Sequence, residues 1–128
     1  MADYIAMIRS NYFQVKDPEK FESFCKNYGL TLFRCEENEK MLYGFYAYES
    51  MPDYDAEKEE EIDFPRELSK HLTEGDVAII QEIGYEKIRY FVGYAVAVNS
   101  KGETVTVSLN EIYERAKNLG THISLCEY

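Results

Sequence analysis

The sequence predicts a single α+β domain over residues 1–128, with a mainly antiparallel, twisted sheet and three helices. Three observations predict this class. Strand-forming segments outnumber helical ones, and the longest of them, Ile83–Val107, folds back on itself at a polar turn. Three other segments combine helical spacing of apolar residues with start and stop signals. Hydrophobic residues make up 45% of the 128 residues, which is enough to bury a core.

The first helix has the clearest boundaries. Asp17 can accept hydrogen bonds from free backbone N–H groups, and Pro18 suits the first helical position because its missing N–H costs nothing there. Gly29 supplies the left-handed position that ends the helix. Four apolar residues at helical spacing predict its buried stripe: Phe21, Phe24, Cys25 and Tyr28. Before the helix, Tyr4–Ile8 alternates like a strand, and residues 12–16 are interpreted as its continuation after a bulge.

Two strands and an acidic segment follow this helix. Leu30–Cys35 and Met41–Tyr48 are predicted as strands around a polar turn. Between Glu49 and Asp63, eight acids stand against one lysine, so most of the net charge of −10 is local. We expect this segment, at about residues 49–63, to be a loop with a short helical turn near Ala56–Glu61.

A second helix is predicted to start at Phe64 and Pro65, where Asp63 can interact favourably with its N-terminus. Leu68 and Leu72 would join Phe64 on one face, and the helix would end at residue 75, a glycine.

The longest strand signal is predicted to form a hairpin. Asp76–Ile83 is a strand, a turn is expected at Gly84–Lys87, and a strand over Ile88–Val98 is followed by a return over residues 104–107. Small side chains let a helix approach a sheet closely, so one face of the long strand should lie under a helix: Phe91, Gly93, Ala95 and Ala97. The other face is expected to be partly open or covered by another part of the chain: Tyr90, Val92, Tyr94, Val96 and Val98.

The chain is predicted to end in a helix and a short strand. Ser108 and Glu111 match a capping box, so a third helix starts at Leu109. Its buried stripe is expected at Leu109, Ile112, Tyr113, Ala116 and Leu119. His122–Cys126 alternates like a last strand. The whole order is a ferredoxin-like βαββαβ start followed by ββαβ.

The composition indicates where in the cell the protein is expected and which kinds of partner are disfavoured. No apolar run approaches the roughly 20 residues needed to cross a bilayer. Asp3 stands where an export signal would be positively charged, and the three cysteines form no CxxC pair. We therefore expect a cytoplasmic protein with reduced thiols and no membrane association. The acidic balance disfavours direct binding of nucleic acid, which requires clustered Lys and Arg.

No catalytic motif or cofactor site is predicted. His71 and His122 are the two histidines, and neither has a second metal ligand at a known spacing. Phosphate-binding glycine loops and hydrolase signatures are missing from the sequence. We therefore expect a non-enzymatic protein that has no catalytic residues, metal or cofactor.

Two groups of residues are candidate binding sites. The first is a run of carboxylates that could be a solvated loop, bind cations loosely, or imitate the phosphates of a nucleic acid: Asp53, Asp55, Glu57, Glu59, Glu60 and Glu61. The second would use sheet tyrosines to stack on a small ligand or nucleic acid, with cations nearby: Tyr90, Tyr94, Arg89 and Arg9.

Four short segments carry a resemblance to known proteins: Ser10-Asn11-Tyr12-Phe13, Val15-Lys16-Asp17, Glu86-Lys87-Ile88-Arg89-Tyr90 and Gly93-Tyr94-Ala95-Val96. In these segments the sequence resembles small uncharacterised proteins of phages and conjugative elements. The resemblance implies a context and no site residues. Small acidic proteins of mobile elements often oppose host restriction or CRISPR nucleases by occupying the place of the nucleic acid.

The leading hypothesis is therefore an anti-defence interaction protein, whose carboxylates meet a basic surface on a host protein. One alternative is a small ligand or nucleic-acid binding module that uses the tyrosine and arginine group. Another is a structural homo-oligomer that pairs through its tyrosine and valine face.

Overall fold

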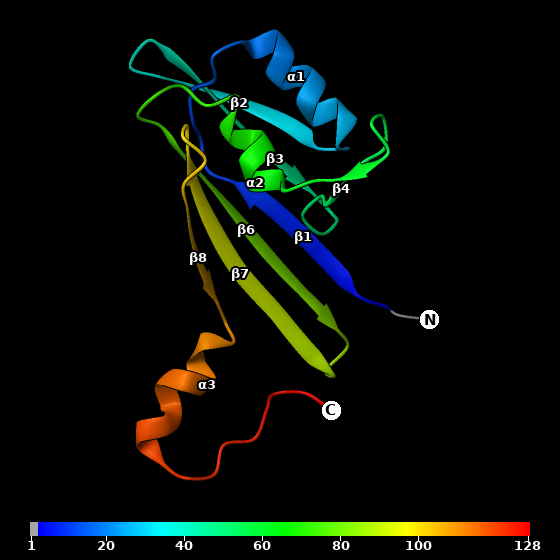
Figure 1. The fold of residues 1–128 in the computed structure, drawn as a ribbon, viewed down its shortest axis with the longest axis vertical. Coiled ribbons are helices and arrows are strands. Elements are labelled where there is room, and N and C mark those ends of the chain that lie inside the picture. Colours follow the sequence, from blue (N-terminus) through cyan, green and yellow to red (C-terminus); the bar gives the residue numbers. More distant parts are fainter. Residues whose placement is uncertain (1–2) are drawn as a thin grey trace.

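A computed structural model describes residues 3–128, which form a six-stranded antiparallel sheet with two helices packed on one side (Figure 1). The sheet strands are β1 (Ile5–Ser10), β2 (Thr31–Glu37), β3 (Lys40–Ala47), β6 (Val77–Glu86), β7 (Tyr90–Asn99) and β8 (Thr104–Ser108). Their order is β2-β3-β1-β6-β7-β8. The α+β prediction is confirmed. Because β3 lies between β1 and β2, the first four strands have the split βαβ order, and β7 and β8 extend the sheet beyond β6.

Helices α1 (Pro18–Asn27) and α2 (Phe64–Ser69) begin where the sequence predicts. The Asp17 carboxylate accepts hydrogen bonds from the backbone N–H groups of Glu19 at 3.1 Å and Lys20 at 3.3 Å. Asp63 accepts one from the backbone N–H of Arg66 at 3.3 Å. These side chains satisfy backbone donors that have no partner inside the helix, which fixes where each helix starts.

Aromatic rings fill the space between the helices and the sheet. Phe24 of α1 stacks on Phe64 of α2 with ring centroids 5.5 Å apart, and Phe64 meets Phe45 of β3 edge-on at 5.8 Å. The fully buried side chains of this core include Phe13, Phe21, Phe45, Phe64, Ile8, Leu68, Leu72, Ile80 and Val98. One continuous core therefore ties both helices to the sheet.

The register divides the sheet residues into two faces. Ile8, Phe45 and Ile80 point toward the helices, on what we call the covered face. Because side chains alternate along each strand, the neighbouring residues lie on the opposite side, the uncovered face. Its main members are Ile5, Met7 and Arg9 of β1, Phe33 of β2, Tyr46 of β3, Val77, Ile79, Gln81, Ile83 and Tyr85 of β6, Phe91, Ala95 and Ala97 of β7, and Val105 and Val107 of β8.

The prediction of which face of β7 lies under a helix is wrong. Val96 and Val98 belong to the buried core beneath the helices, and Phe91 on the other face is 60% exposed. The register explains this reversal, because Val96 pairs with Ile80 across the β6–β7 ladder and the paired residues share one face. The small residues 93, 95 and 97 lie on the opposite face of the sheet, where neither α1 nor α2 packs.

The hairpin turn lies three residues later than predicted. β6 continues through Gly84 to Glu86, and the turn is formed by residues 87–89, where Lys87 has φ of 51°. Gly84 lies within β6 and not in a turn. A Cβ atom at this position would collide with the ring of Tyr4. Glycine therefore marks a close approach of a side chain to the strand.

Two elements in the middle of the chain differ from prediction. The acidic segment contains a small hairpin of β4 (Tyr54–Asp55) and β5 (Glu60–Glu61) in place of the predicted helical turn. Helix α2 stops at Ser69, well before Gly75, because Leu72 forms a β-bridge with Val15 and leaves the helix.

The C-terminal segment differs most from the prediction. α3 (Glu111–Arg115) continues into a 3₁₀ turn, η1 (Ala116–Leu119), and none of their residues is buried. The predicted strand at His122–Cys126 is absent from the described residues, because this segment reaches no free sheet edge with which to pair. Figure 1 shows α3 extending beyond the end of β8, away from α1 and α2.

Candidate functional site

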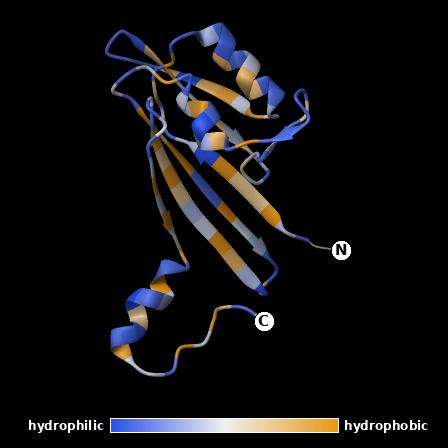
Figure 2. Ribbon diagram, viewed as in Figure 1, coloured by the Kyte–Doolittle hydropathy of each residue, from blue (hydrophilic) through white to orange (hydrophobic). Residues whose placement is uncertain are grey.

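The uncovered face of the sheet is the main unexplained surface of the molecule. No helix of residues 3–128 packs over its centre, although it is lined by apolar side chains. Ile83 is 65% exposed, Phe91 60% and Val105 75%. Figure 2 shows hydrophobic residues distributed along β1, β6, β7 and β8, including the parts that extend past the helices. Folded monomers rarely leave a large contiguous apolar surface in water, so this face indicates a binding surface.

A shallow hollow of about 380 Å³ lies on this face where β1, β6 and β7 run side by side. Its side-chain walls are almost entirely apolar: Ile5, Met7, Tyr48, Ile83, Tyr85 and Phe91. A hollow of this chemistry suits an apolar side chain of a partner, because burial of apolar area from both sides is the main gain on association.

A row of aromatic rings borders the hollow on the β3 and β2 side. Tyr12 meets Phe33 edge-on at 5.0 Å, Phe33 stacks on Tyr46 at 6.4 Å, and Tyr46 meets Tyr48 at 5.7 Å. Gly44 makes this row possible, because a Cβ atom there would overlap the ring of Phe33. Aromatic residues are enriched at the centres of protein interfaces, where they contribute large contact areas.

The uncovered face has very little charge for so acidic a chain. Among residues of β1, β6, β7 and β8 on this face, Arg9 is the single charged side chain. Its guanidinium lies over the ring of Phe33, 5.4 Å from the centroid, and its Nε donates to the carbonyl of Ser10 at 3.1 Å. Most of the net charge of −10 therefore lies elsewhere, in the segment from Glu49 to Asp63, which holds eight acids and one lysine.

A buried carboxylate organises the covered face where the hairpin extends past the helices. Glu82 is 5% exposed, and its carboxylate accepts three hydrogen bonds. The donors are the Tyr94 hydroxyl at 2.9 Å, the Tyr4 hydroxyl at 3.1 Å and the backbone N–H of Met51 at 2.7 Å. Because the carboxylate is surrounded by donors and closed to solvent, it joins β1, β6, β7 and the segment after β3.

Burial and the hydrogen bond to Glu82 change the acidity of both tyrosines. Burial is the larger cause, and together they raise the pKa of Tyr4 to about 12. The same causes, in the same order, raise the pKa of Tyr94. Both hydroxyls are therefore protonated at neutral pH and donate to the Glu82 carboxylate.

The acidic candidates separate into one buried anchor and five exposed carboxylates. Asp55 is 3% exposed and accepts from the Tyr28 hydroxyl at 3.1 Å and from the backbone N–H groups of Glu57 at 2.9 Å and Lys58 at 3.1 Å. Hydrogen bonds from the backbone, that of Lys58 first, lower the pKa of Asp55. The exposed candidates are Asp53, Glu57, Glu59, Glu60 and Glu61. The structure thus holds these five on an ordered hairpin that Asp55 fastens to α1.

The tyrosine and arginine candidates do not come together in one site. Tyr90 and Tyr94 lie on the covered side of the sheet, and Arg9 lies on the uncovered face. Arg9 pairs with Gln81, whereas Arg89 lies in the turn beyond Glu86, which is five strand residues or about 16 Å further along. Arg89 also donates to the carbonyl of Tyr128 at 3.0 Å and to Glu86 at 3.3 Å.

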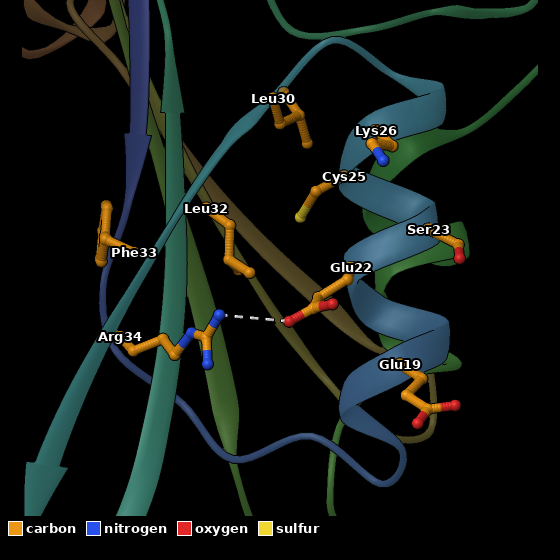
Figure 3. A pocket seen from close by; sticks show the side chains of 9 residues that line it. All are labelled: Glu19, Glu22, Ser23, Cys25, Lys26, Leu30, Leu32, Phe33 and Arg34. Atoms are coloured by element: carbon orange, nitrogen blue, oxygen red, sulfur yellow. Dashed lines mark hydrogen bonds and ion pairs between the residues drawn. The ribbon is translucent and has the colours of Figure 1, made fainter.

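A second concave region, of about 740 Å³, lies between α1 and β2 (Figure 3). The ion pair of Arg34 and Glu22, at 3.3 Å, crosses its opening, and Leu30 and Leu32 form its floor. Cys25 points into it from α1, but burial, and then the charge of Glu22, raise the pKa of its thiol to about 12. A thiol that stays protonated is a weak nucleophile.

The apolar members of the uncovered face were not among the predicted site residues. Ile5, Ile83 and Phe91 stand out only when the register places them together on one side of the sheet. The signal in the sequence was that both faces of β3 and β7 are largely apolar or aromatic, and α1 and α2 pack on only one face of the sheet.

Comparison with known proteins gives no further guide to function. No family model, no curated protein and no solved structure matches this chain. Within residues 3–128, no three His, Cys, Asp or Glu side chains are grouped so that they could hold a metal ion. The described helices include none that is long and apolar enough to span a membrane.

Proposed function

We propose that this protein is a non-enzymatic binding module whose working surface is the uncovered face of the sheet. One observation supports this function above the others. The face is broad, apolar and nearly free of charge, on a chain whose net charge is −10. Its partner is a protein that presents apolar and aromatic side chains, because these are the groups that gain from contact with such a face.

The hollow between Ile5, Ile83 and Phe91 is the expected centre of the contact. Interfaces draw most of their binding free energy from a few central residues in well-packed pockets. The aromatic row from Tyr12 to Tyr48 would then form a second contact area beside it. Polar residues at the ends of the strands would form the rim.

Substitution at the centre of this face tests the proposal. Ile83→Asp introduces a charge beside the hollow, and Ile88→Asp introduces the same charge in the hairpin turn, where Ile88 is also exposed. Affinity capture from extracts of the native cell, with wild type and both variants in parallel, should retain one partner with wild type and Ile88→Asp. Ile83→Asp should lose that partner by at least about tenfold, since a buried unpaired charge costs several kcal/mol. Equal retention by all three proteins would contradict the proposal.

The ordered acidic hairpin supports a second candidate function. In it, the five exposed carboxylates imitate nucleic-acid phosphates and occupy the basic surface of a host defence protein, such as a nuclease, as the resemblance to proteins of mobile elements suggests. The specific observation that favours it is the anchoring of the hairpin through Asp55 and Tyr28, since fixed charges lose little entropy on binding.

A variant with fewer charges on the acidic hairpin separates the two candidates. Changing Glu57, Glu59, Glu60 and Glu61 to glutamine removes four of the five exposed charges and leaves Asp53 and Asp55 in place. Mimicry predicts loss of the captured partner and binding that weakens steeply with salt. Retention of the partner by this variant at unchanged salt dependence would refute mimicry and leave the uncovered face as the remaining candidate.

A further inference from the structure

We infer that two copies of this chain pair through their β8 strands, which joins the two sheets into one continuous sheet about a twofold axis. This inference concerns the edge of the sheet and does not depend on what binds the uncovered face. β8 pairs with β7 on one side only, and within residues 3–128 no strand lies on its other side.

The two edges of the sheet are built differently. β2, at the far edge, carries Arg34, Glu36 and Glu37, and charged side chains are one of the ways in which proteins prevent edge pairing. β8 reads Thr-Val-Thr-Val-Ser over residues 104–108, with no charge, proline or glycine. On a chain of net charge −10, an edge strand without any acid is the part of the sheet that a second copy can approach with least repulsion.

The register shows which backbone groups of β8 are free. The backbone N–H of Leu109 donates to the carbonyl of Gly93 at 2.8 Å, and that of Asn99 donates to the carbonyl of Glu103 at 3.2 Å. In an antiparallel ladder such hydrogen-bonded pairs alternate with pairs whose N–H and C=O groups point away. The groups of Thr104, Thr106 and Ser108 therefore point outward from the sheet.

These outward groups are self-complementary. With Thr106 on a twofold axis, its N–H and C=O meet the C=O and N–H of Thr106 in the second copy, and Thr104 lies opposite Ser108. Only one outward donor is already used, because the Glu111 carboxylate accepts from the backbone N–H of Ser108. The carbonyl of Ser108 remains free to accept from Thr104 of the second copy.

The C-terminal segment gives the pair a second contact. α3 begins three residues after Ser108, so in this register it emerges beside the turn that precedes β8 in the second copy. Leu109 lies against Gly93 of its own chain but is still more than half exposed, as is Ile112, and Leu119 is 90% exposed.

Cross-linking at the axis tests this register. In a Cys35→Ser, Cys126→Ser background, Thr106→Cys places two thiols on strands whose Cα atoms are about 5.5 Å apart, which lies within disulfide range. Thr104→Cys is the matched control, because its own symmetry mate is about 13 Å away along the strands. Mild oxidation should convert most of Thr106→Cys, and little of Thr104→Cys, to a covalent dimer. Equal cross-linking of both, or of neither, would overturn the inference.

Mass in solution provides an independent test with a variant that preserves the fold. Wild type should sediment at twice the chain mass of 15.0 kDa. Thr106→Pro removes one outward N–H and no hydrogen bond within the chain, so it should sediment as a monomer whose circular dichroism spectrum still matches that of the folded wild type. Thr106→Val keeps the N–H and should remain a dimer. A monomeric wild type at high concentration, or a dimeric Thr106→Pro, would contradict pairing through β8.

Discussion

Removal of the Glu82 side chain should loosen the part of the hairpin that lies beyond the helices. Glu82→Ala deletes an acceptor of three hydrogen bonds, at 2.7, 2.9 and 3.1 Å, and leaves the Met51 N–H and two tyrosine hydroxyls without it. Hydrogen bonds to charged groups contribute roughly 1.5–3 kcal/mol each, but the two hydroxyls can turn toward water. We therefore expect a loss of about 3 kcal/mol in the free energy of unfolding.

Urea unfolding followed by circular dichroism measures this loss. With a slope of roughly 1–3 kcal/mol per molar urea, a loss of about 3 kcal/mol should lower the midpoint by about 1–3 M. Glu82→Gln keeps one carbonyl acceptor near the Met51 N–H and should lose only about 1 kcal/mol, and Tyr94→Phe should lose a similar amount. Tyr94 donates a hydrogen bond to Glu82. The free energy lost in a Glu82→Ala, Tyr94→Phe double variant should therefore be smaller than the sum of the losses in the two single variants. A change below about 0.5 kcal/mol in Glu82→Ala would refute the structural role of this carboxylate.

Three further predictions follow from single features of the structure. Gly44→Ala should destabilise the fold by about 1–3 kcal/mol, because the new Cβ displaces the ring of Phe33, and thermal melts should show it. Stability should also fall between pH 10 and pH 12, because burial first, and then carboxylate contacts, raise the pKa of Tyr4 and Tyr28 to about 12 from 10.0. These protonated hydroxyls favour the fold fully below pH 10, and ultraviolet titration of the tyrosines with a parallel melt should detect the loss. Asp55→Ala should free the acidic hairpin and leave the core intact, so hydrogen exchange should quicken at residues 54–61 while α1 is unchanged.

Sequence signals were sufficient for the starts of α1 and α2 and for the order of the first strands, but α3 starts at Glu111 and not at Leu109 as predicted. Asp17, Pro18 and Gly29 act within a few residues of the chain, so their effect on α1 can be predicted without the rest of the fold. The split βαβ order follows from the alternation of strands and helices together with the tendency of sequential elements to pack together.

Features that depend on distant contacts could not be predicted from local signals. Residues 93, 95 and 97 are small, which suits a helix above them, but α2 packs instead over Val96 and Val98 because Ile80 lies beside them. A glycine such as Gly84 is typical of a turn, yet here it lies in a strand and leaves room for the ring of Tyr4, a residue 80 positions earlier in the sequence. Neither choice is determined by residues nearby in the chain.

The candidate surface was predicted only in part for the same reason. An acidic run can be located in a sequence, but the burial of Asp55 depends on Tyr28, 27 residues away. Ile5, Ile83 and Phe91 belong to three different strands, and only the register brings them together. One indication of this surface was present in the sequence: strands whose two faces are both apolar, which predicts that one face of the sheet has no helix packed on it.

Hydroxyl-radical footprinting of the captured complex tests the central claim most directly. If the uncovered face is the binding surface, Met7, Tyr85 and Phe91 should become protected from oxidation when the partner is bound, since all three line its hollow. Tyr54, which is half exposed in the acidic hairpin, should react at the same rate with and without the partner. Protection of Tyr54 with unchanged oxidation of Met7, Tyr85 and Phe91 would contradict the account and place the contact on the acidic hairpin.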